Sequence, residues 1–420
     1  MRIWPGDLAM AGPAVCHIGV RTDRVRALLQ PADAMLSLHQ LVAAALCIPC
    51  LTAGAAPEAC VAPAAPAAEI AEVTEANARL LAGLPPTGVH GVEISGMSFW
   101  LAHARAMDAA WQRTSEHRLA TWRAFAAREI DALDASRAPL FYPFSGPDFL
   151  YAHTLFPRAQ RYLLVGLEPP GGAPRWGAMT AAQAAASLAQ LRQSTSTLLN
   201  LSFFRTESMR GDLNRGQLQG VAPVLMAMAA RSGFNVRAVD EVHLNEGGGL
   251  CIGAATEGRI GGVRLALAEP GGGAPRELVY LRVDLGDRAL AGAPQFERHV
   301  RDLGPGPVFL KAASYLMHKS HFSAVRAMVL ERARLVVQDD SGIPYQAFQA
   351  TQWNGRFYGA YAQPIPKFRD WTQPALREAY ARGALPLDTG IGYSHRRGAS
   401  NLQLFEKRNA SPSMQRTAMK

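Results

Sequence analysis

The sequence predicts an α/β protein with an open, mainly parallel sheet, an antiparallel portion and a helical region in front of it. Three observations support this fold class. Apolar and aromatic residues recur at helical spacing over residues 97–133. Short apolar runs then alternate with helical runs over residues 139–239, which is typical of strands paired in parallel. Finally, two apolar runs flank the Pro- and Gly-rich residues 270–275, which indicates an antiparallel hairpin.

Each element follows from the same local patterns. The helical region covers residues 69–137, with helices expected at 68–84 and 97–133. The α/β domain covers residues 138–397. Its strands are predicted at 139–143, 161–167, 235–239, 262–269, 277–285, 307–313, 334–338 and 355–362, and its helices at 148–156, 181–199, 220–230 and 322–332. Residues 398–420 are polar, and a mobile tail is predicted there.

The beginning of the chain predicts export. Residues 1–34 carry several arginines without hydrophobic periodicity, so we interpret Met35 as the true start and residues 1–34 as a mis-annotated extension. An apolar run at 41–51 and small residues at 53–55 then have the pattern of a secretory signal peptide over 35–55. The run is shorter than the roughly 20 residues of a membrane-spanning helix. An Ala/Pro-rich linker follows at 56–68. The alternative is a buried apolar helix near an unusual N-terminus.

Cysteine usage is compatible with export. Cleavage near Ala55 would leave Cys60 and Cys251 of the five cysteines in the chain. These two could form one disulfide in an oxidising compartment, or Cys251 could be a buried thiol, and the sequence leaves both open. The pair Cys47-x-x-Cys50 lies inside the apolar run, so we interpret it as part of the signal peptide.

The charge of the chain does not indicate a nucleic-acid partner. The formal net charge is +9, but lysine and arginine are scattered among acidic residues without a long basic run. No nucleic-acid-binding motif accompanies the charge. We therefore expect a small polar ligand as the partner, with no nucleic acid and no transmembrane segment.

A resemblance to a known family lies in residues 142–171, YPFSGPDFLYAHTLFPRAQRYLLVGLEPPG. The predicted strand, tight loop, short helix and second strand ending on an acid resemble the start of a class I methyltransferase, the Rossmann-like kind that binds S-adenosylmethionine. The resemblance implies a Rossmann-like fold in which Ser145, Gly146 and Asp148 form the cofactor loop and Glu168 takes the ribose hydroxyls. About 20 residues separate glycine and acid in such folds, which is close to the spacing here. This loop has one glycine, whereas the family usually has two or three.

A second resemblance concerns an uncharacterised group of exported bacterial proteins. The stretches YPFSGPDFLY, VFLKAASYLMH and QDDSGIPYQAF are similar to segments of those proteins. The resemblance implies export and brings no activity or cofactor with it.

The QDDSGIPY stretch is a candidate site, because a predicted strand delivers two adjacent acids to a turn. Ligands of α/β proteins bind at the carboxyl ends of strands. Asp339 and Asp340 are expected to face opposite ways, since successive strand residues alternate. One of the two acids could then bind a ligand or a metal, with Asp340 and Ser341 as the candidates for action on a ligand, or Asp340 caps the turn as an Asx motif.

Further candidates follow other predicted strands. Lys311 ends a strand and binds a ligand or pairs with Asp340. His318 and His321 are three residues apart and could share a helix face for a metal, but no third ligand is evident and no metal is predicted. Arg205, in FFRTESMRGDL, clamps an anion or lies in a solvated loop. Asp148 is an N-cap of the helix that follows it, or a base in a cleft.

The sequence thus predicts a set of site residues and a ranked set of functions. Predicted catalytic residues are Asp148, His318 and Asp340, and predicted ligand-binding residues are Ser145, Gly146, Glu168, Arg205, Lys311 and Ser341. The first hypothesis is an exported envelope protein, periplasmic or secreted, that binds or hydrolyses a small polar or sugar-like ligand at the strand ends. The alternatives are a methyltransferase-like enzyme that uses S-adenosylmethionine, and a structural or interaction protein without a site.

Overall fold

The computed structural model describes residues 60–61, 65–134, 136–201, 217–361, 363–393 and 400–408. Within these residues the chain forms a mixed α/β fold around one ten-stranded sheet with the order β4-β3-β5-β6-β2-β1-β7-β8-β10-β9. The predicted signal peptide, about half of the predicted linker and the candidate Arg205 lie outside the described residues. None of the described helices is long and apolar enough to cross a membrane.

The five central strands of the sheet are parallel to one another. Their side chains are almost all buried, because helices cover both faces, and this is why their sequences are nearly continuous apolar runs. In sheet order these strands are β6 (Arg276–Arg282), β2 (Arg161–Gly166), β1 (Leu140–Tyr142), β7 (Gly306–Leu310) and β8 (Ala333–Gln338).

Antiparallel strands flank the parallel block on both sides. Beside β6 they are β5 (Gly261–Ala268), β3 (Asn235–Leu244) and β4 (Leu250–Ile252). Beside β8 they are β10 (Asn401–Lys407) and β9 (Trp353–Gly359). The predicted hairpin is confirmed as the antiparallel pair β5 and β6. The sheet is therefore mixed, with its parallel part in the centre.

The prediction of a mobile polar tail is wrong for Asn401–Lys407, because these residues form strand β10. This strand inserts between β8 and β9 and is buried over Asn401 to Phe405. The polar residues misled the prediction because their partners are distant in sequence. The Asn401 amide donates to the Asp340 carboxylate at 3.1 Å, and the Gln338 amide donates to Gln403 at 3.0 Å. Hydrogen bonds of this kind allow amide side chains to occupy a sheet interior.

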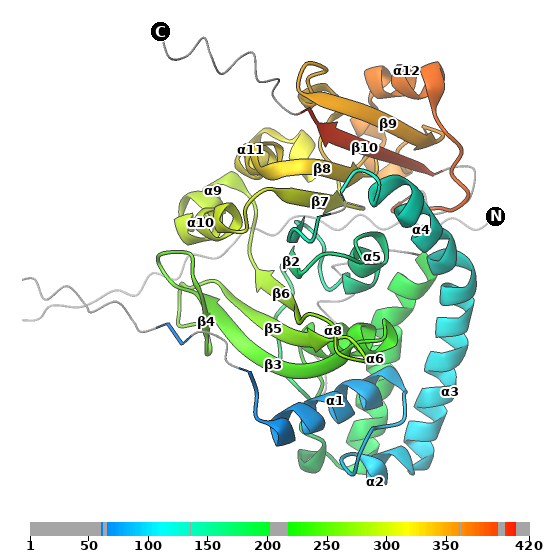
Figure 1. Cartoon of the computed structure of the whole chain (residues 1–420), viewed down its shortest axis with the longest axis vertical. Helices are drawn as coiled ribbons and strands as arrows, with labels where there is room; N and C mark the ends of the chain where they lie inside the picture. The colour runs from blue at the N-terminus through cyan, green and yellow to red at the C-terminus, as the bar shows by residue number, and fades with distance from the viewer. Residues whose placement is uncertain are drawn as a thin grey trace, which may run out of the picture. The chain divides into compact units, whose positions relative to one another are not determined.

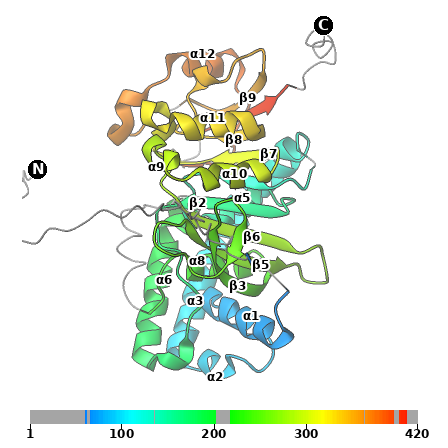
Figure 2. The same cartoon turned by 90° about the vertical axis from the view of Figure 1, so that its left-hand side faces the viewer.

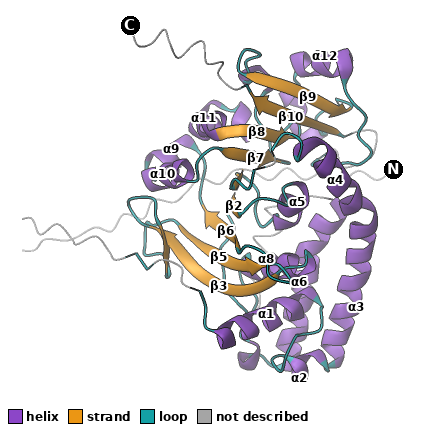
Figure 3. Ribbon diagram, in the orientation of Figure 1, coloured by secondary structure: helices purple, strands orange, loops and turns teal. Residues whose placement is uncertain are grey.

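Helices cover the two faces of the sheet. One face carries α1 (Ala68–Ala82), α3 (Ser98–Arg113), α4 (Ala120–Phe125), α5 (Phe149–Leu155), α6 (Ala181–Leu201) and α8 (Ala222–Arg231), whose apolar residues join one core cluster with the sheet. A second cluster packs α10 (Pro294–Asp302) and α11 (Ser323–Arg332), with α9 (Asp287–Ala291) beside them, on the opposite face. Figures 1 and 3 show these helices on either side of the strands, and Figure 2 views the molecule from the α9–α11 side.

The predicted N-terminal helical region is confirmed. Helix α1 matches the expected helix, and α3 continues through π-helical turns and α4 as far as Ile130. Several elements had no predicted counterpart: the short helix α2 (Val92–Ser95), helix α12 (Pro374–Gly383), helices α9 and α10, and strands β4 and β10. The aromatic stripe is core, since Trp100 and Trp122 are buried against other helices and the sheet.

The two cysteines that the predicted cleavage would leave form a disulfide. Cys60 and Cys251 are bonded, with their Cα atoms 5.0 Å apart. Next to the bond, the Ile252 N–H donates to the Val61 carbonyl at 3.2 Å. The first described residues are thereby fastened to β4, the edge strand of the sheet. The alternative of a free buried thiol at Cys251 is excluded.

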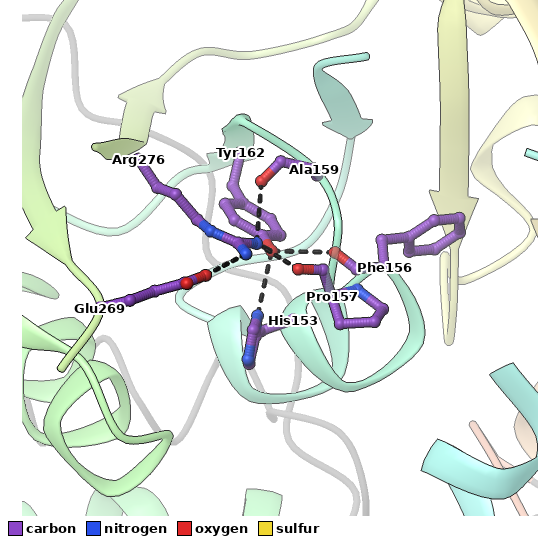
Figure 4. A network of polar contacts seen from close by, with 7 residues as sticks. All are labelled: His153, Phe156, Pro157, Ala159, Tyr162, Glu269 and Arg276. Carbon is purple, nitrogen blue, oxygen red and sulfur yellow. Dashed lines mark hydrogen bonds and ion pairs between the residues drawn. The ribbon is translucent and has the colours of Figure 1, made fainter. Parts of the chain in front are cut away.

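A polar network anchors the amino-terminal ends of β2 and β6 (Figure 4). The Tyr162 hydroxyl donates to the Phe156 carbonyl at 2.8 Å and lies 3.0 Å from Nδ1 of His153. Arg276 donates to the Pro157 carbonyl and pairs with Glu269. Because these contacts join α5, the loop after it and the β5–β6 connection, they hold α5 in place behind the site described next.

Candidate ligand-binding cleft

A cavity of about 510 Å³ lies at the carboxyl ends of the parallel strands β1, β2, β6 and β7. In the sheet, β2 and β6 lie on one side of β1, whereas β7 and β8 lie on its other side. The order of the strands along the chain therefore reverses between β1 and β7. In open α/β sheets this change of direction leaves a crevice in which ligands bind. Ser145, Gly146, Asp148, Glu168 and Lys311, all predicted as site residues, line this cavity.

The loop after β1 is held against β2 by the side chain of Ser145. Its backbone N–H donates to the Val165 carbonyl at 2.9 Å, and its hydroxyl accepts from the Val165 N–H at 3.0 Å. The backbone on either side is left-handed, with φ of 60° at Phe144 and 53° at Gly146. Ser145 therefore continues the β1–β2 pairing through its side chain and shapes the cleft wall.

Glu168 occupies the end of β2 as the sequence predicted, and its side chain is 1% exposed. The Tyr280 hydroxyl and the Leu167 N–H both donate to its Oε2 atom at 3.1 Å. Its other oxygen, Oε1, accepts no hydrogen bond within the described part of the chain. A buried carboxylate with a spare acceptor oxygen at a cavity wall suits a ligand that donates hydrogen bonds.

Gly166 allows this arrangement, and the sequence analysis missed it. A Cβ atom at this position would overlap with Oε2 of Glu168 and lie 2.7 Å from the Tyr280 hydroxyl oxygen and 3.0 Å from Cα of Gly146. The glycine needed for close approach thus stands at the end of β2 rather than in the loop after β1. The order Gly-Leu-Glu at the end of a predicted strand was the signal that could have identified it.

Asp148 and Lys311 form a buried ion pair across the floor of the cleft. Lys311 Nζ lies 2.5 Å from Asp148 Oδ2, with both side chains at most 2% exposed. The Tyr142 hydroxyl donates to the same oxygen at 2.9 Å, and the Tyr151 N–H donates to Oδ1 at 3.2 Å. Lys311 also lies over the Tyr151 ring, 3.7 Å from its centroid. Burial raises the pKa of Asp148 and lowers the pKa of Lys311, while their mutual attraction opposes both shifts.

Two alternatives from the sequence are decided by these contacts. Asp148 is the N-cap of α5, because its carboxylate accepts the N–H of the third helical residue, and it lines the cavity as well. The predicted pairing of Lys311 with Asp340 is wrong, since the strand order brings Lys311 to Asp148 at the end of β1.

The loop after β7 has a strained backbone. Ala312, Ser314 and Tyr315 have φ of 52°, 56° and 54°, a left-handed conformation that non-glycine residues rarely adopt. Together with Phe144 they account for every non-glycine residue of positive φ in the described ranges, and all four lie in the two loops of the cleft. Strain of this kind persists where the surroundings over-determine it, and it concentrates at functional sites.

Asp339 and Ser341 support this strained loop from β8. The Ala312 N–H donates to Oδ2 of Asp339 at 2.9 Å, and the Ala313 N–H donates to the Ser341 hydroxyl at 2.8 Å. Asp339 Oδ1 also accepts from the Ser341 N–H at 3.0 Å. The Asx turn predicted for Asp340 is therefore made by Asp339, and Ser341 contacts the loop rather than lining the cavity.

Asp340 faces away from its neighbour, as the alternation of strand residues predicted. Its carboxylate accepts from the Tyr315 hydroxyl and from the Asn401 amide. Asp340 is 5% exposed and does not line the cavity. Its burial raises its pKa. Its contacts place it behind the cleft, where it holds Tyr315.

His318 also lies behind the cleft rather than in its lining. Its ring packs 5.2 Å from the Tyr315 ring and 5.8 Å from the Trp371 ring, centroid to centroid. Burial, followed by the nearby charge of Arg326, lowers its pKa to about 4. Within the described residues, no group of three or more His, Cys, Asp or Glu side chains is arranged to hold a metal ion.

The C-terminal part of the chain forms one wall of the cleft, and none of the residues in this wall was predicted as a site residue. Ile365, Lys367, Phe368 and Tyr393 line the cavity. The Phe368 ring lies 5.2 Å from the rings of both Tyr315 and Tyr393, and the Tyr393 hydroxyl donates to the Ala312 carbonyl at 3.0 Å. No local sequence pattern marks these residues, because they reach the cleft through the placement of β9 and β10.

Comparison with known proteins identifies no match to this chain. A scan against models of protein families, a search of curated proteins and a search of solved structures each find no match. The function must therefore be argued from the cleft itself.

Proposed function

We propose that this chain is an exported protein whose cleft binds a small polar, sugar-like ligand. The observation that carries the proposal is the buried Glu168 carboxylate in the wall of the cavity, with Oε1 left without a protein donor in the described residues. A carboxylate in this position accepts hydrogen bonds from ligand hydroxyls. Aromatic rings of Phe144, Phe368 and Tyr393 on the other walls offer apolar surface to the face of a sugar ring.

A Rossmann-like arrangement of the parallel block supports the location of this site. Numbered by their order along the chain, strands β1, β2, β6, β7 and β8 lie in the sheet order 3-2-1-4-5. This is the order of doubly wound folds, which bind ligands where it reverses, between the strands numbered 1 and 4. The cavity lies at the carboxyl ends of those two strands, β1 and β7.

Export is supported by the disulfide. A bond between Cys60 and Cys251 forms and persists in oxidising compartments such as the periplasm or the extracellular space. The disulfide joins Cys60, inside the proposed linker and shortly after the proposed signal peptide, to the folded domain. We therefore expect the ligand to be a sugar-like compound of the cell envelope or of the extracellular medium.

Binding is favoured over hydrolysis by the state of Asp148. Its carboxylate already receives Lys311, the Tyr142 hydroxyl and the Tyr151 N–H. A general acid or nucleophile needs an oxygen within hydrogen-bond reach of the substrate, and three protein donors compete for it here. We assign Asp148 to the floor of the cleft and Glu168 to ligand contact.

The proposal is tested by calorimetric titration of the full chain, purified from its own host, with a panel of monosaccharides, aminosugars and nucleosides. We expect saturable binding of at least one sugar-like compound, and Glu168→Gln is expected to weaken it about tenfold or more, as loss of a charged hydrogen-bond partner does. Glu297→Gln, on the exposed surface of α10, is the matched control and leaves binding unchanged. Binding that survives Glu168→Gln intact would remove Glu168 from the site, and absence of binding across the panel would contradict the proposal.

A second candidate, a methyltransferase-like enzyme, is favoured by one observation. Gly146 and Glu168, which the resemblance assigns to cofactor contact, line the same cavity. S-adenosylmethionine is therefore included in the titration, and its binding in place of sugars would select this candidate. A structural or interaction protein without a site is the outcome in which neither binds.

A further inference from the structure

The cleft is covered by a cap that we define as residues 364–373 and 391–393. Four side chains of the cap line the cavity, namely Ile365, Lys367, Phe368 and Tyr393. The first part follows β9 and contains a 3₁₀ segment, Pro366–Trp371. Access to the cavity therefore depends on how the cap is held.

The carboxylate of Asp339 lies directly beneath one part of the cap. A Cβ atom at Gly392, where φ is +63°, would overlap with Asp339 Oδ2. The cap backbone thus rests on this carboxylate. From the other sides Asp339 receives the Ala312 N–H, the Ser341 N–H and the Ser341 hydroxyl.

The adjacent residue, Asp340, is linked to the other part of the cap through its backbone carbonyl and, by way of Tyr315, through its carboxylate. The Gln373 amide donates to the Asp340 backbone carbonyl at 3.0 Å. The Tyr315 hydroxyl donates to the Asp340 carboxylate, and the Tyr315 ring packs against Phe368 of the cap. Of these two neighbouring acids, Asp339 therefore contacts one part of the cap and Asp340 is linked to the other.

Within the described ranges, these acids are enclosed with little positive charge around them. Asp339 is 3% and Asp340 is 5% exposed. The other titratable groups that act on the pair are the amine of Lys311, already paired with Asp148, and the hydroxyls of Tyr142, Tyr315, Tyr361, Tyr380 and Tyr393. Burial, followed by repulsion from Asp340, raises the pKa of Asp339 to about 7 despite its hydrogen bonds.

The direction of the coupling follows from linkage. When the part of the cap above Asp339 lifts, this carboxylate regains contact with water, where an aspartate has a pKa of about 3.9. The closed state then binds protons more tightly than the open state, so protons stabilise closure. Opening becomes easier as pH rises from about 4 towards about 7 and levels off above this, once both states are ionised.

We propose that the cap is a proton-controlled lid: it is held shut over the cleft while Asp339 and Asp340 retain a proton, and it loosens when both ionise. The control of ligand access rests on the proposed function, whereas the opening of the cap rests on its contacts with the two acids and on their burial. A ligand is then retained in acidic surroundings and exchanged near neutral pH.

The opening is measured by hydrogen–deuterium exchange of the full chain without ligand, from pH 4.5 to 8.0, corrected for the intrinsic pH dependence of amide exchange. We expect corrected exchange in peptides covering residues 364–373 to rise by up to about tenfold per pH unit below pH 7 and to level off above it. Peptides from the sheet core, such as β2, show no such rise. Since no ligand is present, a failed ligand screen leaves this result unaffected.

Two variants and a control decide the assignment. Asp339→Asn weakens the pH dependence of cap exchange and leaves only the part due to Asp340, whose pKa burial also raises. Asp340→Asn moves the rise in cap exchange to lower pH, because it removes the neighbouring charge that raises the pKa of Asp339. The control is Asp287→Asn: Asp287 accepts a hydroxyl and two N–H groups from Ser323 and Ala324, but it is only half-buried and does not line the cavity. Its variant keeps the wild-type profile.

The proposal is overturned if wild-type cap exchange is flat after correction, or if Asp339→Asn retains the wild-type pH profile. Should Asp339→Asn fail to fold, as judged by circular dichroism, the Asp340→Asn variant decides. A downward shift of its profile supports the lid, and an unchanged profile refutes it.

Discussion

Lys311 Nζ lies 2.5 Å from Asp148 Oδ2 at the point where the parallel sheet changes direction. Lys311 follows β7 and Asp148 follows β1, so this ion pair joins the two loops that form the cleft floor. Both groups are almost fully withdrawn from solvent. Charges in such a position are expensive to bury and are tolerated only as a pair.

Removing one partner of this pair is expected to destabilise the protein strongly. Lys311→Met leaves the Asp148 carboxylate buried without its cation, and we expect a loss of about 3–5 kcal/mol in the free energy of unfolding. The double variant Asp148→Asn with Lys311→Met recovers a large part of the loss. Lys367→Met, an exposed lysine on the same cavity, is the control, and urea unfolding is the measurement. A single variant as stable as the wild type would contradict the assignment.

Gly166 is expected to tolerate no side chain. A Cβ atom there would displace Glu168 or Tyr280, so Gly166→Ala is expected to cost about 1–3 kcal/mol of stability, as overpacking does, and to weaken ligand binding. Gly177→Ala serves as the control, because a Cβ atom at Gly177 meets nothing within 4 Å. Equal thermal midpoints for the two variants would show that the end of β2 has room to adjust.

The disulfide is expected to contribute measurably to stability. The bond closes a loop between residues separated by 191 positions, and long loops lose much entropy on closure. Cys60→Ser or a reducing agent is therefore expected to lower the free energy of unfolding by about 2–4 kcal/mol. Thermal unfolding with and without reductant measures the effect. The Cys60→Ser variant is its own control, since reductant should change its midpoint no further.

Stability is expected to fall as pH drops below about 6.5, partly because of His153. Burial, followed by the charge of Arg276, lowers the pKa of His153 to about 3. Between pH 6.5 and 3 the unfolded chain therefore binds a proton that the folded chain does not, and this contribution to stability declines as pH falls. The expected slope is up to about 1.4 kcal/mol per pH unit.

The contribution of His153 is isolated by comparing variants in urea unfolding at several pH values. His153→Phe keeps a ring between Phe149 and Phe234 and reduces the acid dependence. His321→Phe, at an exposed position, leaves the dependence unchanged. Parallel stability profiles for the wild type and His153→Phe would assign the acid sensitivity to other groups.

The mature N-terminus is the measurement that bears most directly on export. We expect mass spectrometry of the protein from its own host to find a start near Ala56, in the periplasm or the medium. The basis is the predicted signal peptide at 35–55 and the disulfide that follows it. An N-terminus that retains residues 35–55 in the cytoplasmic fraction would refute export and strengthen the methyltransferase-like alternative.

Prediction from sequence succeeded where the signal was local. The helices at α1, α3 and α8 and the strands β1, β2, β5 and β7 follow from hydrophobic periodicity, and Asp148 follows from N-cap chemistry. It failed for β10, whose buried polar residues resemble a solvated tail until Asp340 and Gln338 are seen to pair with them. It also failed for Tyr393 and Phe368, since their role depends on a wall built by distant segments.

By itself, the sequence determined the α/β class, the helical region before the sheet, the acid at the end of β2 and the two cysteines available for a bond. These depend on residue type and on spacing within a few turns or strands. Only the tertiary structure decided that Lys311 meets Asp148, that Gly166 makes room for Glu168 and that the cap rests on Asp339. Such contacts follow from strand order, which is set by packing between segments far apart in the chain.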